Sequence, residues 1–159
     1  MTTDPARTEC TLNDDGRLTI AVGTVAGHTA LRAGLPEKVQ QCLADAVVRA
    51  CRETFAVVGN NGGRPRQDSA IRVVIAGFPD RVEAVIEYSG GQLPKSSLDS
   101  VLRCGAPEAK GAATGPADAS RLDRVHYATC DGRSRLTLVK YRGTVEPKLN
   151  DESQIRKFP

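Results

Sequence analysis

The chain has 159 residues, of which 40% are hydrophobic and 26% charged, as expected for one ordinary soluble domain. Its net charge of +3 comes from 22 basic and 19 acidic residues without a concentrated basic stripe, so nucleic acid is not expected as a partner. No segment approaches the ~20 apolar residues that cross a bilayer, and the N-terminus has no apolar leader core, so we expect a cytoplasmic protein without a membrane partner.

The first part of the chain is polar and rich in turn residues. Residues 1–16 end in Asn13-Asp14-Asp15-Gly16, a run that favours tight turns, so we expect a flexible N-terminal segment before the fold begins at residue 17. Arg17–Val22 then alternates apolar and polar residues, which is typical of a half-buried strand. A short helix is expected between Thr24 and Ala33.

The clearest helix of the chain begins at Pro36, because proline suits the first helical turn. We expect the helix to end near Gly59. Its apolar residues recur at steps of three and four and give one continuous apolar face: Val39, Leu43, Ala46, Val47, Ala50 and Phe55.

Two antiparallel hairpins are predicted in the second half of the chain. Ile71–Ala76 and Val82–Glu87 face each other across a turn that contains glycine and proline. Val125–Thr129 and Leu136–Tyr141 flank Asp131-Gly132, a strong signal for a tight hairpin turn.

The connections are less regular. Residues 88–121 form a predicted long loop, a lid or a disordered segment, in which Leu98, Val101 and Leu102 could make one or two helical turns. Residues 143–159 are charged and carry no apolar face, so we expect a disordered tail.

Five cysteines make an odd number, and none lies in Cys-x-x-Cys spacing. Neither a disulfide framework nor a zinc site is indicated, so we expect reduced thiols.

The order of these elements predicts the fold class. Strand, helix, hairpin, long loop and hairpin give an α+β fold, a two-layer α/β sandwich whose mostly antiparallel sheet is covered by helices. The domain is expected to span residues 17–142.

Several segments carry a more specific resemblance. They are the helix segment Leu43–Cys51, the hairpin end Ile86–Gly91, the run Leu122–Tyr127 and the strand Arg135–Lys140. Together they resemble the Bergerat-type ATP-binding domain shared by gyrase, the Hsp90 chaperones and histidine kinases. The resemblance is closest to the anti-sigma-factor serine kinases of bacterial partner-switching systems.

In that family the long helix carries Glu-x-x-x-Asn, in which Asn binds magnesium and Glu acts as the base. The resemblance places Asp45 and Arg49 at these positions. A second family motif is Asp-x-Gly-x-Gly, in which Asp reads the adenine amino group. Tyr88 falls on that Asp, Gly90 matches the first glycine beside Gly91, and glutamine replaces the second glycine.

The family's phosphate lid has its nearest match in the segment that ends at Gly115. The small hydroxyl residue near the adenine is matched by Ser134, and the apolar run after it ends in Lys140. The resemblance therefore implies a nucleotide site built from Asp45, Arg49, Tyr88, Gly90, Gly91, Gly115 and Ser134.

The replaced residues change the expected chemistry. Mg²⁺ prefers oxygen ligands, and the Arg49 guanidinium has only donors, so we expect neither bound magnesium nor another cofactor. ATP stays open, because Arg49 could pair directly with a phosphate. Asp45 is a doubtful base, since it is one methylene shorter than Glu; a surface ion pair between Asp45 and Arg49 is the favoured alternative.

Other candidate residues have simpler interpretations. Tyr88 could stack on a base, but filling the pocket is favoured because the core has few aromatic residues. His28 and His126 lie beside no other candidate ligand and are expected to have structural roles. Lys140 and Arg142 are interpreted as exposed charges at a strand end.

Three functional hypotheses follow. The first is a noncatalytic, anti-sigma-factor-like regulator that binds a sigma factor or an anti-anti-sigma factor. The second is an active ATP-dependent serine kinase, and the third a structural or oligomerisation domain without a ligand. A homodimer is compatible with each.

Overall fold

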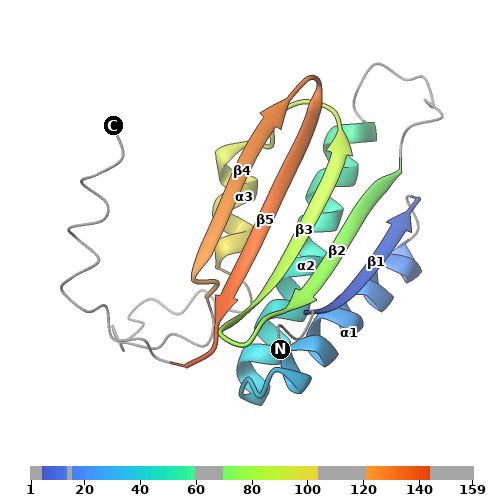
Figure 1. The fold of residues 1–159 in the computed structure, drawn as a ribbon. Helices are drawn as coiled ribbons and strands as arrows, with labels where there is room; N and C mark the ends of the chain where they lie inside the picture. Colours follow the sequence, from blue (N-terminus) through green and yellow to red (C-terminus); the bar gives the residue numbers. More distant parts are fainter. Residues whose placement is uncertain (1–4, 14–15, 60–69, 104–120, 144–159) are drawn as a thin grey trace.

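The computed structural model describes residues 5–13, 16–59, 70–103 and 121–143. These residues form a five-stranded antiparallel sheet with three helices on one face (Figure 1). The spatial order of the strands is β1-β2-β3-β5-β4. The elements are β1 (Ala6–Leu12), α1 (Gly16–Arg32), α2 (Glu37–Gly59), β2 (Ile71–Gly77), β3 (Arg81–Ser89), α3 (Lys95–Leu102), β4 (Arg124–Cys130) and β5 (Arg133–Tyr141). The predicted α+β class and two-layer sandwich are confirmed.

The predicted long helix is confirmed as α2. The carbonyl O of Pro36 accepts hydrogen bonds from the N–H groups of Val39 at 2.9 Å and Gln40 at 3.0 Å, so the proline stands immediately before the first turn. All members of the predicted apolar face are buried: Val39, Leu43, Ala46, Val47, Ala50 and Phe55. None of the helices in the described ranges has the length and apolarity needed to cross a membrane.

Both predicted hairpins are present. β2 pairs with β3, and β4 pairs with β5, each antiparallel. Asp131 and Gly132 join β4 to β5 with φ angles of +52° and +75°, as a type I′ turn requires. The predicted helical turns around Leu98 form α3, whereas residues 104–120 of the predicted loop and the tail from residue 144 lie outside the described residues.

The strand predicted at Arg17–Val22 is wrong, because these residues form the first half of α1 and the helix predicted at Thr24–Ala33 is its continuation. Leu18 and Ile20, which suggested the alternation, are 44% and 55% exposed. The inward face of α1 consists mainly of small residues: Thr19, Val22, Gly23, Ala26 and Ala30. Such residues permit close helix packing but give only a weak hydrophobic period.

The expectation that residues 1–16 lie outside the fold is also wrong. Residues 6–12 form the edge strand β1, which pairs antiparallel with β2 from Ala6 opposite Gly77 to Leu12 opposite Ile71. Most side chains of β1 are exposed, so the strand lacks a strong apolar pattern. Backbone pairing with β2 provides the order that local propensity does not.

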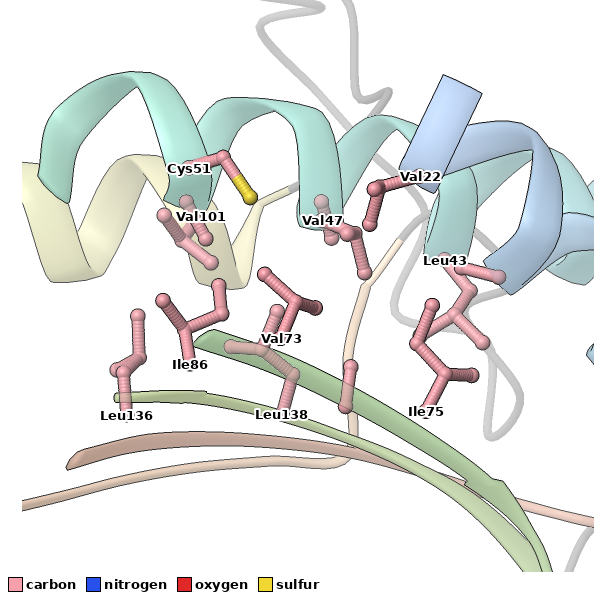
Figure 2. Close-up of a cluster of buried hydrophobic side chains, with 14 of the residues drawn as sticks. Val22, Leu43, Val47, Cys51, Val73, Ile75, Ile86, Val101, Leu136 and Leu138 are labelled. Carbon is pink, nitrogen blue, oxygen red and sulfur yellow. The ribbon is translucent and has the colours of Figure 1, made fainter. Parts of the chain in front are cut away.

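The core lies between the helices and the sheet (Figure 2). Residues from both layers meet there: Val22, Leu43, Val47, Cys51 and Val101 from the helices, and Val73, Ile75, Ile86, Leu136 and Leu138 from the strands. Burial raises the pKa of the Cys51 thiol to about 12 and favours its neutral form. Cys42 is disulfide-bonded, so the expectation of reduced thiols is wrong for this residue.

The other face of the sheet carries a chain of ion pairs across four strands, here called the ion-pair ladder. Glu9 accepts from Arg72 at 2.6 Å and lies 3.5 Å from Arg7. Glu87 lies 2.9 Å from Arg72 and 2.7 Å from Arg135. Hydrogen bonds from Arg72 are the main cause of the lowered pKa of both carboxyl groups.

The ladder predicts a specific pH dependence. Because the pKa values of Glu9 and Glu87 are lower in the folded than in the unfolded chain, their stabilisation is present above the ordinary value of 4.5 and is lost as pH falls through the folded values. Arg72→Gln should therefore lower the urea midpoint at about pH 6, with the difference from wild type shrinking towards about pH 3. Arg124→Gln, which changes an exposed arginine on β4, is the control. A pH-independent difference for Arg72→Gln would contradict the prediction.

Candidate functional site

The helix α2 presents the two residues that the resemblance places at the base and metal positions. Asp45 is exposed, and Arg49 is partly buried against α3. Nη1 of Arg49 donates to the carbonyl O of Ser100 at 2.9 Å. The predicted surface ion pair between Asp45 and Arg49 is wrong: it is absent from the ion pairs of the described residues, and the guanidinium is turned to α3 instead.

The contact of Arg49 stabilises the junction between α2 and α3. Ser100 lies in the last turn of α3, where carbonyl groups lack partners within the helix and carry the negative end of its dipole. A second contact supports the same junction, since Oγ of Ser97 donates to Oε2 of Glu53 at 2.6 Å. Arg49 therefore helps to fix α3 on α2, with its positive charge directed at the end of that helix.

Tyr88, which the resemblance places at the adenine-reading carboxylate, is buried in the core and only 3% exposed. Its hydroxyl donates to the carbonyl O of Gly91 at 3.1 Å and lies 3.4 Å from the hydroxyl of Tyr127. The ring thus occupies interior space at the C-terminal end of β3.

Tyr88 belongs to a hydroxyl cluster that also contains Tyr127, Thr129 and Ser134. The Tyr127 hydroxyl donates to Oγ of Ser134 at 2.8 Å and accepts from Oγ1 of Thr129 at 3.0 Å. Oγ of Ser134 donates to the carbonyl O of Gly90 at 3.2 Å. The register of β3 and β5 explains the assembly, because Tyr88 lies directly opposite Ser134.

The pKa values of the two phenols in the cluster are shifted in opposite directions. Burial, followed by the hydrogen bond with Tyr127, raises the pKa of Tyr88. Burial also acts to raise the pKa of Tyr127, but hydrogen bonds with Ser134, Thr129, Tyr88 and the backbone of Leu93 together outweigh it, and the pKa is lowered. Tyr127 is therefore the more acidic hydroxyl of the pair.

Removing one member should alter both stability and acidity. Ser134→Ala deletes the donor to Gly90 and the acceptor of the Tyr127 hydroxyl, so we expect a loss of about 1–3 kcal/mol in the free energy of unfolding. The pKa of Tyr127 should rise, because Ser134 can no longer donate a hydrogen bond to the deprotonated phenol. NMR titration of the Tyr127 ring and urea unfolding measure both effects. Ser96→Ala, at an exposed position of α3, is the control; an unchanged Tyr127 pKa in Ser134→Ala would contradict the assignment.

The structure thus brings together only part of the predicted nucleotide site. Tyr88, Gly90, Gly91 and Ser134 share contacts, whereas Arg49 contacts α3. A β-carbon at Gly91 would meet nothing within 4 Å, so that glycine is not required by close packing. Gly115 lies outside the described residues.

The polar groups of the interior are satisfied by the protein itself. Every buried side-chain nitrogen or oxygen in the described part of the chain has a hydrogen-bond partner. In the same residues, no group of three or more His, Cys, Asp or Glu side chains is placed to hold a metal ion.

Lys140 corrects another expectation from the sequence, because it is 7% exposed rather than a free surface charge. Its Nζ donates to the carbonyl O of Arg121 at 2.7 Å and to Oδ1 of Asp123 at 3.3 Å. Oδ2 of Asp123 accepts from the N–H of Tyr141 at 2.7 Å. Lys140 and Asp123 thereby connect the segment before β4 to the end of β5.

A cavity at the opposite end of the sheet was missed by the sequence analysis. Arg32 and His28 of α1 line it together with Arg142, which follows β5. The sequence signal that could have located it is Gly34, a helix-terminating glycine that marks where α1 ends. Because residues 1–16 were expected to lie outside the fold, the part of the wall that comes from β1 could not be predicted.

The comparisons leave the family of this chain open. The chain matches no known family in a comparison with protein-family profiles, and a search of curated proteins finds no significant match.

Proposed function

We propose that this protein is an anti-sigma-factor-like regulator with a kinase-type ATP-binding fold, which acts by binding a protein partner and has impaired or absent nucleotide chemistry. The partner is a sigma factor or an anti-anti-sigma factor, and the site of action is the cytoplasm. The two-layer fold and the order of α2, β3 and β5 are compatible with this family.

The observation that carries the proposal is the position of Arg49. A guanidinium has no lone pair for a metal ion and is permanently charged, so it cannot replace the asparagine that binds magnesium in the family. Here it also donates to the Ser100 carbonyl and supports α3. Tyr88 adds a second argument, since a buried ring replaces the carboxylate that would read adenine.

Isothermal titration of the full chain with Mg·ATP, and separately with ATP in the presence of a chelator, tests the nucleotide part. We expect no binding in the micromolar range in either titration. Micromolar binding of Mg·ATP would contradict the proposal. Binding only without magnesium would show that Arg49 pairs with phosphate. The protein would then bind the nucleotide without a metal ion.

A capture experiment from the native host tests the partner. We expect a sigma factor or an anti-anti-sigma factor to be retained, and the purified pair to bind equally well with and without ATP. Asp45→Ala should leave this affinity unchanged, because the proposed activity needs no base. Association that strictly requires ATP would contradict the proposal.

One observation favours the second candidate, an active serine kinase: the Asp45 carboxylate is exposed and not paired with Arg49. Incubation with radiolabelled ATP and the captured partner distinguishes the candidates. A kinase gives labelled phosphoserine that disappears in Asp45→Ala, whereas the noncatalytic regulator gives no label.

A further inference from the structure

A cavity of about 680 Å³ lies at the end of the sheet where β2 turns into β3. Its walls come from the C-terminal half of α1, the start of β1, the turn after Gly77, and Arg142 beyond the end of β5. The hydroxyl cluster lies at the other end of β3, a nine-residue strand that spans roughly 25 Å at ~3.3 Å per residue. The cavity is therefore distinct from the candidate nucleotide site.

The charged residues that line this cavity are all basic among the described residues. Arg32 and Arg142 line it with His28, and no described lining residue is acidic. Among the ion pairs of the described residues, Arg72 and Arg81 each have carboxylate partners, whereas neither cavity arginine takes part in one. Two arginines thus line one hollow, and among the described residues no acidic side chain lines it with them.

The end of α1 accounts for only a fraction of this positive charge. The helix ends in a Schellman motif, in which Leu35 N–H donates to Ala30 O at 3.0 Å and Gly34 N–H donates to Leu31 O at 2.9 Å. The C-terminal dipole corresponds to about −0.5 charge, against two full positive charges. The helix end therefore offsets only a part of the positive charge of the two arginines.

The side chain of Arg142 lies beside the same helix end. Gly34 has φ of +78°, and a β-carbon there would lie 3.3 Å from Nη2 of Arg142. The backbone N–H of Arg142 donates to the carbonyl O of Asp80 at 2.7 Å. The guanidinium thus lies over a glycine at the cavity wall, with its backbone anchored to the β2–β3 turn.

The rest of the wall is largely apolar. Val25, Ala33, Phe78 and Pro79 line it, and the guanidinium of Arg81 stands 4.4 Å from the centre of the Phe78 ring. This stacking fixes one side of the ring as a rigid part of the wall. A matching ligand has an anionic head and an apolar body.

We propose that this cavity binds a small organic phosphomonoester, with its phosphate between Arg32 and Arg142 and its apolar part against Phe78 and Pro79. A phosphomonoester carries about −1.5 to −2 charge at neutral pH, which matches two guanidinium groups better than the single charge of a carboxylate does. The volume is within the usual range of small-molecule sites. This inference is independent of the proposed regulatory function, because it uses no residue of the nucleotide site.

The test is an NMR titration of the full chain at constant ionic strength with three probes: phenyl phosphate, benzoate and inorganic phosphate. We expect phenyl phosphate to bind at least tenfold more tightly than either of the others, with amide shifts concentrated at Gly34, Gly77 and Phe78. Arg32→Gln and Arg142→Gln should each weaken phenyl phosphate binding at least tenfold. Arg124→Gln, which removes an exposed arginine from β4, should leave it unchanged.

Any one of several outcomes would overturn the proposal. They are equal affinity for benzoate and phenyl phosphate, shifts that lie elsewhere on the protein, and unchanged affinity in both cavity variants. Absence of phenyl phosphate binding at millimolar concentration would do the same. Since Arg32 and Arg142 are both exposed, the variants are expected to fold, and their thermal unfolding provides the check.

Discussion

Leu43→Ala is expected to lower the free energy of unfolding by about 2–5 kcal/mol, because it leaves a cavity where the helices meet the sheet. Leu43 is fully buried on α2 and lies among Val22, Val47 and Ile75 (Figure 2). Because the neighbouring side chains belong to both layers, they cannot easily move into the cavity that the substitution leaves. Urea unfolding monitored by circular dichroism gives the difference directly.

The matched control is Leu31→Ala, which makes the same substitution at a helix position that is 54% exposed. Its effect should stay within about 0.5 kcal/mol. Equal effects at the two positions would mean that the interface of α2 with the sheet is not the core of the protein.

Gly23→Ala is expected to lower the free energy of unfolding by about 1–3 kcal/mol, although alanine favours a helix by ~1 kcal/mol over glycine. A β-carbon at Gly23 would clash with Cγ2 of Val48 and would lie 3.1 Å from the carbonyl O of Ala44. Valine has one strongly preferred side-chain rotamer in a helix, so it cannot easily turn away. The clash forces α1 away from α2.

Two further variants isolate this effect. At Gly27 a β-carbon would lie 3.5 Å from Cβ of Ala44, an ordinary contact, so Gly27→Ala should stabilise the protein by about 0.5–1 kcal/mol. Adding Val48→Ala to Gly23→Ala should recover stability beyond the sum of the single effects, as measured by a double-mutant cycle. Additive effects would contradict the proposed close approach.

The Gly23 prediction also explains why α1 was misassigned. Glycine and alanine at the helix contact are what let α1 approach α2, yet they give little hydrophobic contrast in sequence. Leu18 and Ile20 gave a stronger signal, but both are largely exposed. Which of these residues face inward is decided by the surface of α2, and that information is not local.

Only part of the candidate site could be predicted from the sequence. Tyr88 as a pocket-filling ring follows from a core with few aromatic residues, and the burial of the ring agrees with that interpretation. The choice of Ser100 as the partner of Arg49 could not be predicted, because the two residues are 51 positions apart and meet only when α3 docks on α2. The hydroxyl cluster likewise depends on the register of β3, β4 and β5.

Elements whose signals are local could be predicted from the amino-acid sequence alone. The period of α2, its start after Pro36 and the Asp131-Gly132 turn all follow from backbone sterics and from apolar residues a few positions apart. Three features could not be predicted and are seen only in the folded chain: the strand β1, the burial of Lys140 and the cavity beside Arg142. Each of these depends on groups far apart in the chain, whose hydrogen bonds and charges come together only after the sheet has formed.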